Sequence, residues 1–121
     1  MFVKSINWID EDSQEAEIIV SDGCIEVICF SHPLKKGINS VLEDPIHCFD
    51  AENVVLAQEQ SVSVNKSTNH FAYSLRGKLV DKKNKLVHLG DIILCLEDAY
   101  ISNGIPESSY VEFDVSRLDL Y

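Results

Sequence analysis

The chain has 121 residues, of which 45% are hydrophobic and 25% are charged. These values are typical of a globular protein and exclude a disordered, collagen-like or low-complexity chain. Its 20 acidic and 10 basic residues give a formal net charge of −10. Such a balance argues against a general nucleic-acid binder, whose affinity comes from lysines and arginines that neutralise phosphates. The length favours a single domain over residues 1–121.

The N-terminal segment turns acidic within ten residues and has no apolar stretch of the kind that a secretory signal contains. No run reaches the length of about 18 apolar residues that a membrane-spanning helix needs. We therefore expect a cytoplasmic protein without a membrane partner.

Alternation of apolar and polar residues is the dominant pattern along the chain and predicts β-strands. Residues 2–8 are expected to form the first strand, with Phe2, Ile6 and Trp8 on one face. Residues 15–20 form a half-buried strand with the even-numbered side chains inward. The dipeptide Asp22-Gly23 readily adopts positive φ and predicts a tight hairpin into residues 24–30.

The clearest strand spans residues 71–80, with Phe71, Tyr73, Leu75 and Leu79 on its apolar face. Because Gly77 interrupts that face, we expect a bulge or the corner of a barrel there. Phe71 and Tyr73 lie opposite the basic side chains of this strand and are expected to fill the core.

Further strands are expected at residues 86–89 and 92–97, separated by Gly90-Asp91, and at residues 111–115. The apolar parity changes after Val115, which predicts a bulge or strand end near Ser116-Arg117. Residues 32–40 and 98–106 have the composition of loops. Residues 50–60 suit either a short helix or a strand.

About eight strands with at most one short helix indicate an all-β fold, an antiparallel barrel or sandwich. Its core is expected to contain apolar side chains from the three most regular strands: Ile18, Val20, Leu75, Leu79, Phe113 and Val115.

Charge is spread unevenly, with a net of −6 over residues 1–30, −3 over residues 31–65 and −1 over residues 66–121. The acidic end contains a cluster that we predict to bind a partner: Asp10, Glu11, Asp12, Glu15 and Glu17. We expect the first three in a turn, and Glu15 and Glu17 on the solvent face of the next strand. A basic hairpin is expected at the other end, formed by Arg76, Lys78, Lys82, Lys83 and Lys85.

No motif supports an enzyme or a cofactor. The four cysteines, Cys24, Cys29, Cys48 and Cys95, form no C-x-x-C pair and are expected to be reduced and mostly buried. His47 and Cys48 are neighbours in an extended segment and so face opposite ways, which does not suit a base and its nucleophile. The four histidines lack metal-ligand spacing. We therefore expect no catalytic, cofactor-binding or metal-ligating residues.

Two resemblances extend this interpretation. Residues 90–121 resemble the closing strands of small OB-like barrels, in which a strand that opens with Gly-Asp, here Gly90-Asp91, precedes a final strand of the V-x-F-x-V kind, here Val111, Phe113 and Val115. A single acidic domain without catalytic motifs is also similar to the bacterial immunity proteins that are paired with nuclease toxins, including those of contact-dependent inhibition systems.

The second resemblance implies a non-enzymatic module that neutralises a basic toxin, because an acidic surface complements the cationic cleft of a nuclease. Two alternatives remain open: an OB-like oligonucleotide-binding domain that uses the basic hairpin, and an acidic adaptor subunit of a larger assembly.

Overall fold

The computed structural model describes all residues, 1–121, and contains eleven strands and no helix. The prediction of an all-β fold is confirmed, with more strands than the eight or so expected. The strands are β1 (Phe2–Asp10), β2 (Glu15–Ser21), β3 (Glu26–Ser31), β4 (Ile46–Phe49), β5 (Glu52–Leu56), β6 (Ser63–Lys66), β7 (Tyr73–Asp81), β8 (Leu86–Leu89), β9 (Ile92–Cys95), β10 (Tyr110–Val115) and β11 (Arg117–Leu120).

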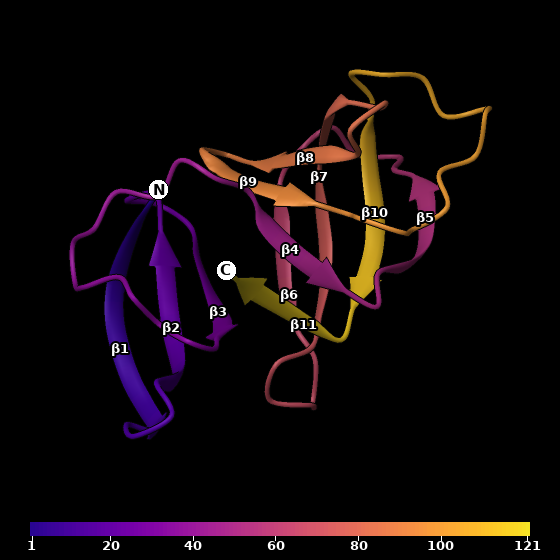
Figure 1. The fold of residues 1–121 in the computed structure, drawn as a ribbon. Helices are drawn as coiled ribbons and strands as arrows, with labels where there is room; N and C mark the ends of the chain where they lie inside the picture. Colours follow the sequence, from indigo (N-terminus) through magenta and orange to yellow (C-terminus); the bar gives the residue numbers. More distant parts are fainter.

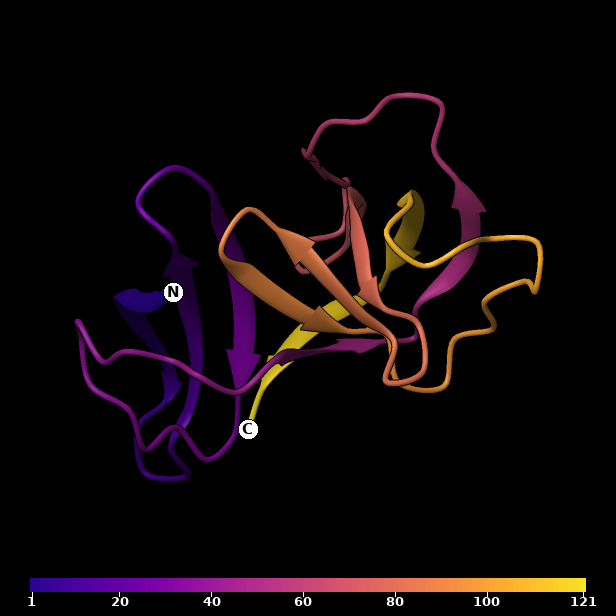
Figure 2. The ribbon, with the colours of Figure 1, turned by 90° about the horizontal axis from the view of Figure 1, so that it is seen from above.

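All strands belong to one strongly bent sheet in the order β1-β2-β3-β11-β4-β9-β8-β7-β10-β5, with β6 paired to β7. The order has two ends, β1 and β5, so the sheet is not closed. Strands β1 to β3 form a meander on one side of the molecule, and β4 to β10 curl together on the other (Figures 1 and 2). Most pairs are antiparallel as expected, but β3 pairs with β11 and β4 pairs with β9 in parallel.

The first strand differs from the prediction in which side chains share a face. A register shift between Val3 and Ser5 interrupts the alternation of β1. As a result Val3, which lies opposite Val20, is fully buried, whereas Phe2 lies opposite Ser21 on the other face. Single-sequence alternation does not reveal such a bulge, because the extra residue changes the parity without changing the composition.

The second and third strands follow the expected pattern, with one difference at their turn. The even-numbered residues of β2 are buried and its odd-numbered side chains are half-buried, except for Ser21 at the end of the strand, which is buried. The connection is a four-residue loop, 22–25, rather than a tight hairpin, and β3 begins at Glu26. The Asp22 side chain organises this loop, because its Oδ1 accepts the N–H groups of Cys24 and Ile25 at 2.9 and 2.7 Å.

Gly77 lies within a regular part of β7, and the expected bulge occurs instead between Leu79 and Asp81. A Cβ atom at Gly77 would lie 2.7 Å from the carbonyl oxygen of His88 and 2.7 Å from the Val87 side chain. Glycine is therefore needed because β8 crosses closely over this position, and not because the strand bulges.

The ambiguous residues 50–60 contain strand β5, which pairs with β10 at the edge of the sheet. Strand β6 was not expected from the sequence, and half of its residues are exposed. The parity change after Val115 is confirmed as the break between β10 and β11, after which Leu118 and Leu120 are buried.

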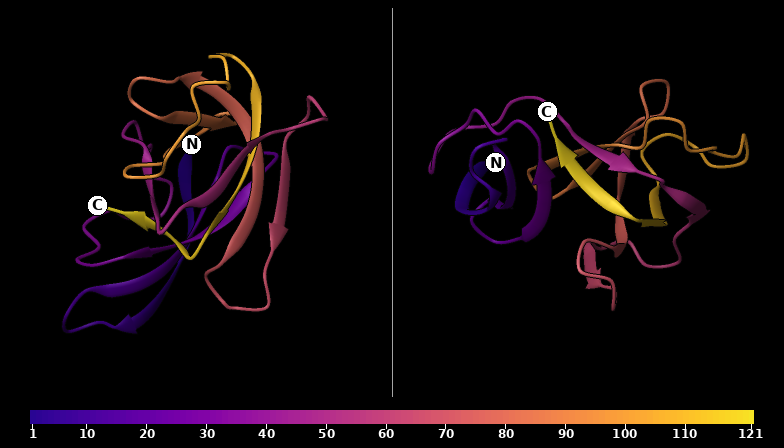
Figure 3. Two further views of the ribbon diagram at one scale, coloured as in Figure 1. Left: turned by 90° about the vertical axis from the view of Figure 1, so that its right-hand side faces the viewer. Right: turned by 60° about the horizontal axis from the view of Figure 1, so that its bottom comes forward.

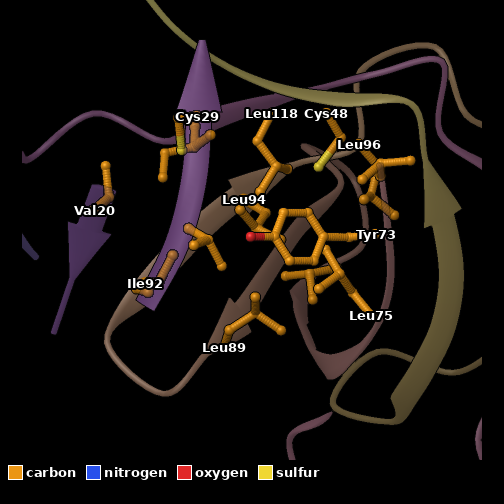
Figure 4. Packing of buried hydrophobic residues seen from close by; sticks show 14 of the residues in the cluster. Val20, Cys29, Cys48, Tyr73, Leu75, Leu89, Ile92, Leu94, Leu96 and Leu118 are labelled. Atoms are coloured by element: carbon orange, nitrogen blue, oxygen red, sulfur yellow. The ribbon is translucent and has the colours of Figure 1, made fainter. Parts of the chain in front are cut away.

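A single cluster of 26 buried residues runs through both parts of the sheet and contains all six predicted core residues. Tyr73 lies within it, with its ring among leucines of the other strands and its hydroxyl directed toward β3 (Figure 4). Its Oη accepts the backbone N–H of Ile28 at 2.9 Å. The prediction for Phe71 is wrong, because this residue precedes β7, is half-buried and meets the ring of Phe30 edge-on.

Candidate partner-binding surface

The turn between β1 and β2 carries the acidic cluster and projects from the edge of the molecule, away from the strands of the other side (Figures 1 and 3). Asp10 is the last residue of β1, and its Oδ1 accepts the N–H groups of Asp12 and Ser13 at 3.1 and 3.4 Å. Residues 11–14 make the turn, and Gln14 has a φ of 60°. Glu15 and Glu17 follow on the outer face of β2.

The five predicted acids fall into two groups. Asp10 and Glu17 have partners within the chain: Asp10 caps the turn, and Glu17 accepts a hydrogen bond from Asn7 Nδ2 at 3.1 Å and contacts His70 Nε2. The side chains of Glu11, Asp12 and Glu15 make no ion pair and no hydrogen bond. We call these three residues the acidic tip.

Glu17 is held by its neighbours and is only 17% exposed. The hydrogen bond from Asn7 is the largest influence on its pKa and lowers it, burial opposes this, and His70 lowers it further. The pKa of Glu17 therefore lies below its ordinary value. Because Glu17 is on β2 and His70 lies between β6 and β7, the Glu17 carboxylate joins the two sides of the molecule and is less available to a partner.

Two large apolar side chains near the end of β1 are exposed, and the pairing of Trp8 with Ala16 puts the Trp8 side chain on the face of the sheet opposite to Glu15 and Glu17. Trp8 is 40% exposed and Ile9 is 51% exposed. Exposed tryptophan is rare on a free surface and is enriched in protein interfaces, where a few residues contribute most of the binding energy.

A second group of side chains continues across the outer face of the sheet from Glu17. Cross-strand pairing places Glu17 beside Phe30, Phe30 beside Asp119, and Asp119 beside His47. The guanidinium of Arg117 lies 4.5 Å from the Phe30 ring centroid and 4.9 Å from that of Phe49.

Arg117 also donates to both carboxylate oxygens of Asp119, at 2.5 and 3.1 Å. Asp119 is 4% exposed, so this contact provides the countercharge that a buried carboxylate needs. The hydrogen bond to Asp119 raises the pKa of Arg117 further above its already high ordinary value. Sequence reasoning missed this cluster, although the parity change at Ser116 could have indicated that Arg117 and Asp119 share the outer face.

The basic residues of 66–85 do not assemble into a free cationic groove. Arg76 is 17% exposed at its side chain and binds Glu59 and Glu112, each at 3.1 Å. Lys82 Nζ donates to the carbonyl of Ser102 at 3.0 Å, and Lys85 Nζ donates to that of Ala99 at 2.7 Å. These charges hold loops in place, which leaves Lys78 and Lys83 as the hairpin cations without a hydrogen bond.

The cysteines are all free thiols, but only Cys29 and Cys48 are buried; Cys95 is half-buried and Cys24 is exposed. Burial raises the pKa of Cys48 well above the ordinary value, so this thiol is not an activated nucleophile. His47 faces the opposite side, as expected, against the ring of Tyr121 and the carboxylate of Glu97. The contact with Glu97 lacks hydrogen-bond geometry, and His47 Nδ1 is buried without a hydrogen-bond partner.

No group of three or more histidine, cysteine, aspartate or glutamate side chains converges in a way that could hold a metal ion. The chain also contains no helix that is long and apolar enough to cross a membrane.

Comparison with protein families, with curated proteins and with solved structures found no match to this chain.

Proposed function

We propose that the chain is a non-enzymatic protein-binding module, an immunity-type protein that binds and neutralises a basic partner such as a nuclease toxin domain. The observation that carries the proposal is the acidic tip: three carboxylates without internal partners, two on the projecting turn and one at the first residue of β2.

The charges of the rest of the chain support this choice of site. Most of the lysine and arginine side chains are paired or hydrogen-bonded within the chain, as Lys4 is to Glu26 and Arg76 is to Glu59. The negative charge at the tip is therefore not compensated by ion pairing. A carboxylate cluster of this kind steers a cationic partner toward the surface beside it and raises the association rate.

The test compares two variants with the same change of charge. Asp12→Lys/Glu15→Lys reverses two tip acids, and Glu43→Lys/Asp44→Lys reverses two acids beyond the opposite end of β1, which also lack ion pairs. Each variant and the native protein would be used to recover partners from native bacterial cytosol, and association rates would be measured for the recovered protein.

We expect a basic partner whose association rate falls about tenfold or more as ionic strength rises from about 0.01 M to 0.15 M, because the screening length shrinks from about 30 Å to about 8 Å. The tip variant should lose most of this steering and the control variant should keep it. A salt-independent rate, or equal loss in both variants, would contradict the acidic tip as the binding site.

The oligonucleotide alternative receives less support from the geometry. Single-strand binders stack bases on exposed aromatic side chains inside a cationic groove. Here Tyr73 is buried, and the hairpin cations Arg76, Lys82 and Lys85 are engaged within the chain. If charge reversal at the tip created tight binding of single-stranded RNA while no protein partner was recovered, this alternative would take precedence.

A further inference from the structure

Strands β3 and β6 present edges to each other that pair with no other strand. Strand β6 pairs with β7 along one edge and with nothing along the other. Strand β3 pairs with β2 along its whole length, but with β11 only at Phe30 and Ser31, so its second edge is free over residues 26–29. A hollow of about 320 Å³ lies between the two edges and is lined by residues of both strands, with Ile19 of β2 and Tyr73 of β7.

The direction of the backbone groups on the β3 edge follows from the hairpin that precedes it. In an antiparallel pair, successive residues alternate between bonding to the partner strand and pointing away from it. The N–H of Asp22 donates to the carbonyl of Ile25 at 3.2 Å and so fixes this alternation for β2 and β3. Glu26 and Ile28 therefore direct their N–H and C=O groups away from β2, toward the hollow. The hydroxyl of Tyr73 accepts the N–H of Ile28 from that side, in agreement with this direction (Figure 4).

The same alternation gives the direction of the groups on the β6 edge. The N–H of Ser67 donates to the carbonyl of Ala72 at 2.9 Å, one position beyond the last paired residues of β6 and β7. Val64 and Lys66 therefore direct their N–H and C=O groups away from β7, and both residues line the hollow. Unpaired edge groups of this kind are a template for another extended chain.

The relative direction of the two edges allows one chain to pair with both. Strand β3 is parallel to β11, β11 is antiparallel to β4, and β4 is parallel to β9. The next three pairs, from β9 through β8 and β7 to β6, are antiparallel. Strands β3 and β6 consequently run in the same direction, so a chain between them can be antiparallel to both. Its successive residues would bond to β3 and to β6 in turn.

This arrangement selects the kind of chain that fits. An edge strand of a folded sheet already uses one of its two sides, and so it cannot bond to β3 and β6 together. For the same reason β1 and β5, the end strands of this sheet, cannot fill the hollow of a second copy. The occupant must be a single extended segment with both sides free.

We propose that the hollow binds an extended segment of another protein, a tail or a flexible loop, inserted antiparallel between β3 and β6. About four of its residues lie between the edges, because β6 has four residues. Main-chain hydrogen bonds provide the affinity, and the lining by Ile19, Ile28 and Val64 favours apolar side chains in the segment. The site does not include the acidic tip and does not depend on the proposed function.

The probe is a peptide selected on the native protein from a phage-displayed library of random heptapeptides and then synthesised. Isothermal titration calorimetry compares it with versions that carry a single N-methyl group at each central position. Because each N–H donates to one edge or the other, every central methylation should weaken binding about tenfold or more. Loss at alternate positions only would mean pairing with one edge and would overturn the insertion. The absence of any selected peptide that binds saturably would overturn the site.

Two variants at one position test the β6 edge. Lys66→Pro and Lys66→Ala both lose the contact of Lys66 Nζ with the carbonyl of Asn69, but only proline also removes the N–H that points into the hollow. Lys66→Pro should weaken peptide binding about tenfold or more, and Lys66→Ala should bind nearly as the native protein does. Equal binding by the two variants would contradict the role of this edge.

Two further measurements keep the outcomes separate. Circular dichroism checks that both Lys66 variants fold; if Lys66→Pro does not, the methylation series on the native protein decides the proposal. Asp12→Lys/Glu15→Lys should bind the peptide as the native protein does, because these residues do not line the hollow. Loss of peptide binding in this variant would contradict the hollow as the peptide site, whatever the result for a basic partner at the tip.

Discussion

The two ends of the sheet use their acidic side chains in different ways. Around β7 and β10, the carboxylates have partners: Glu112 binds Arg76, and Asp114 accepts hydrogen bonds from Ser74 Oγ at 2.7 Å and Asn53 Nδ2 at 3.2 Å. At the turn between β1 and β2 and the first residue of β2, Glu11, Asp12 and Glu15 have none. A count of acids does not distinguish these situations, because an acid that is already hydrogen-bonded stabilises the fold, whereas a free one is available to a partner.

The two ends are nevertheless joined through one narrow region. Strand β11 pairs with β3 at only two positions, Asp119 with Phe30 and Leu120 with Ser31. Two side-chain hydrogen bonds also join the ends. The Tyr73 hydroxyl accepts the backbone N–H of Ile28, and Asp22 Oδ2 accepts the backbone N–H of Asp91 at 3.0 Å. Whether the two ends unfold together depends on this joint.

The largest effect on the free energy of unfolding is expected from Leu79→Ala, which creates a cavity in the part of the core that β7 covers. Leu79 has no exposed surface, and such a truncation costs about 2–5 kcal/mol. Urea unfolding would be followed by circular dichroism and by the fluorescence of Trp8, the only tryptophan, which lies at the other end of the sheet. Coincident transitions would show that the two ends share one cooperative core; a Trp8 transition that keeps its midpoint would separate them.

Gly77→Ala should cost about 1–3 kcal/mol, because the added methyl group would press against the backbone of His88 and the side chain of Val87. Gly104→Ala is the matched control: its Cβ would come no closer than 3.7 Å to another group, and its φ is not positive. Thermal unfolding of both variants checks this prediction. A stable Gly77→Ala protein would mean that β8 is not held against β7 as described.

Asp22→Asn tests the joint between the two ends and should cost about 1–3 kcal/mol at neutral pH, since the amide loses the negative charge and keeps only one oxygen to accept the N–H groups of Cys24, Ile25 and Asp91. Burial acts to raise the pKa of Asp22, but the N–H groups of Ile25, Asp91 and Cys24 outweigh it, and the pKa lies below its ordinary value.

The pH dependence follows from that direction. A depressed pKa stabilises the fold above the unfolded-state pKa of about 3.9, and this contribution is lost as the pH falls through the folded-state value. The difference in unfolding free energy between the native protein and Asp22→Asn should therefore shrink below about pH 4. A difference that stayed constant down to acid unfolding would contradict the role of the Asp22 charge.

The smallest effect on folding is expected at the acidic tip. Asp12→Lys/Glu15→Lys should change the unfolding free energy by less than about 0.5 kcal/mol, because neither side chain has a partner within the chain. Chemical denaturation measures this change. Glu17→Lys is the contrasting variant and should destabilise the protein more, because it breaks the contacts with Asn7 and His70.

Local patterns determined a large part of this fold. The alternation in β2, β7 and β10 was enough to predict the strands and which of their side chains are buried, because a strand with one face on the core must alternate with period two. The same reasoning placed Glu11 and Asp12 in a turn and Glu15 on an outer face. The turn residues Gly90 and Asp91, and the change of parity at Ser116, also predicted strand ends correctly, because turns need residues that tolerate their backbone geometry.

Several other features were decided by the tertiary structure alone. The pairing of β11 with β3 on one side and with β4 on the other joins residues far apart in the sequence, and it brings Arg117 beside both Phe30 and Phe49. The bulge in β1 reversed the facing of Phe2, because parity depends on register and not on composition. Whether a charge is free also depends on distant neighbours: Glu17 meets His70 from another part of the chain, whereas Glu15, two residues before it, has no partner.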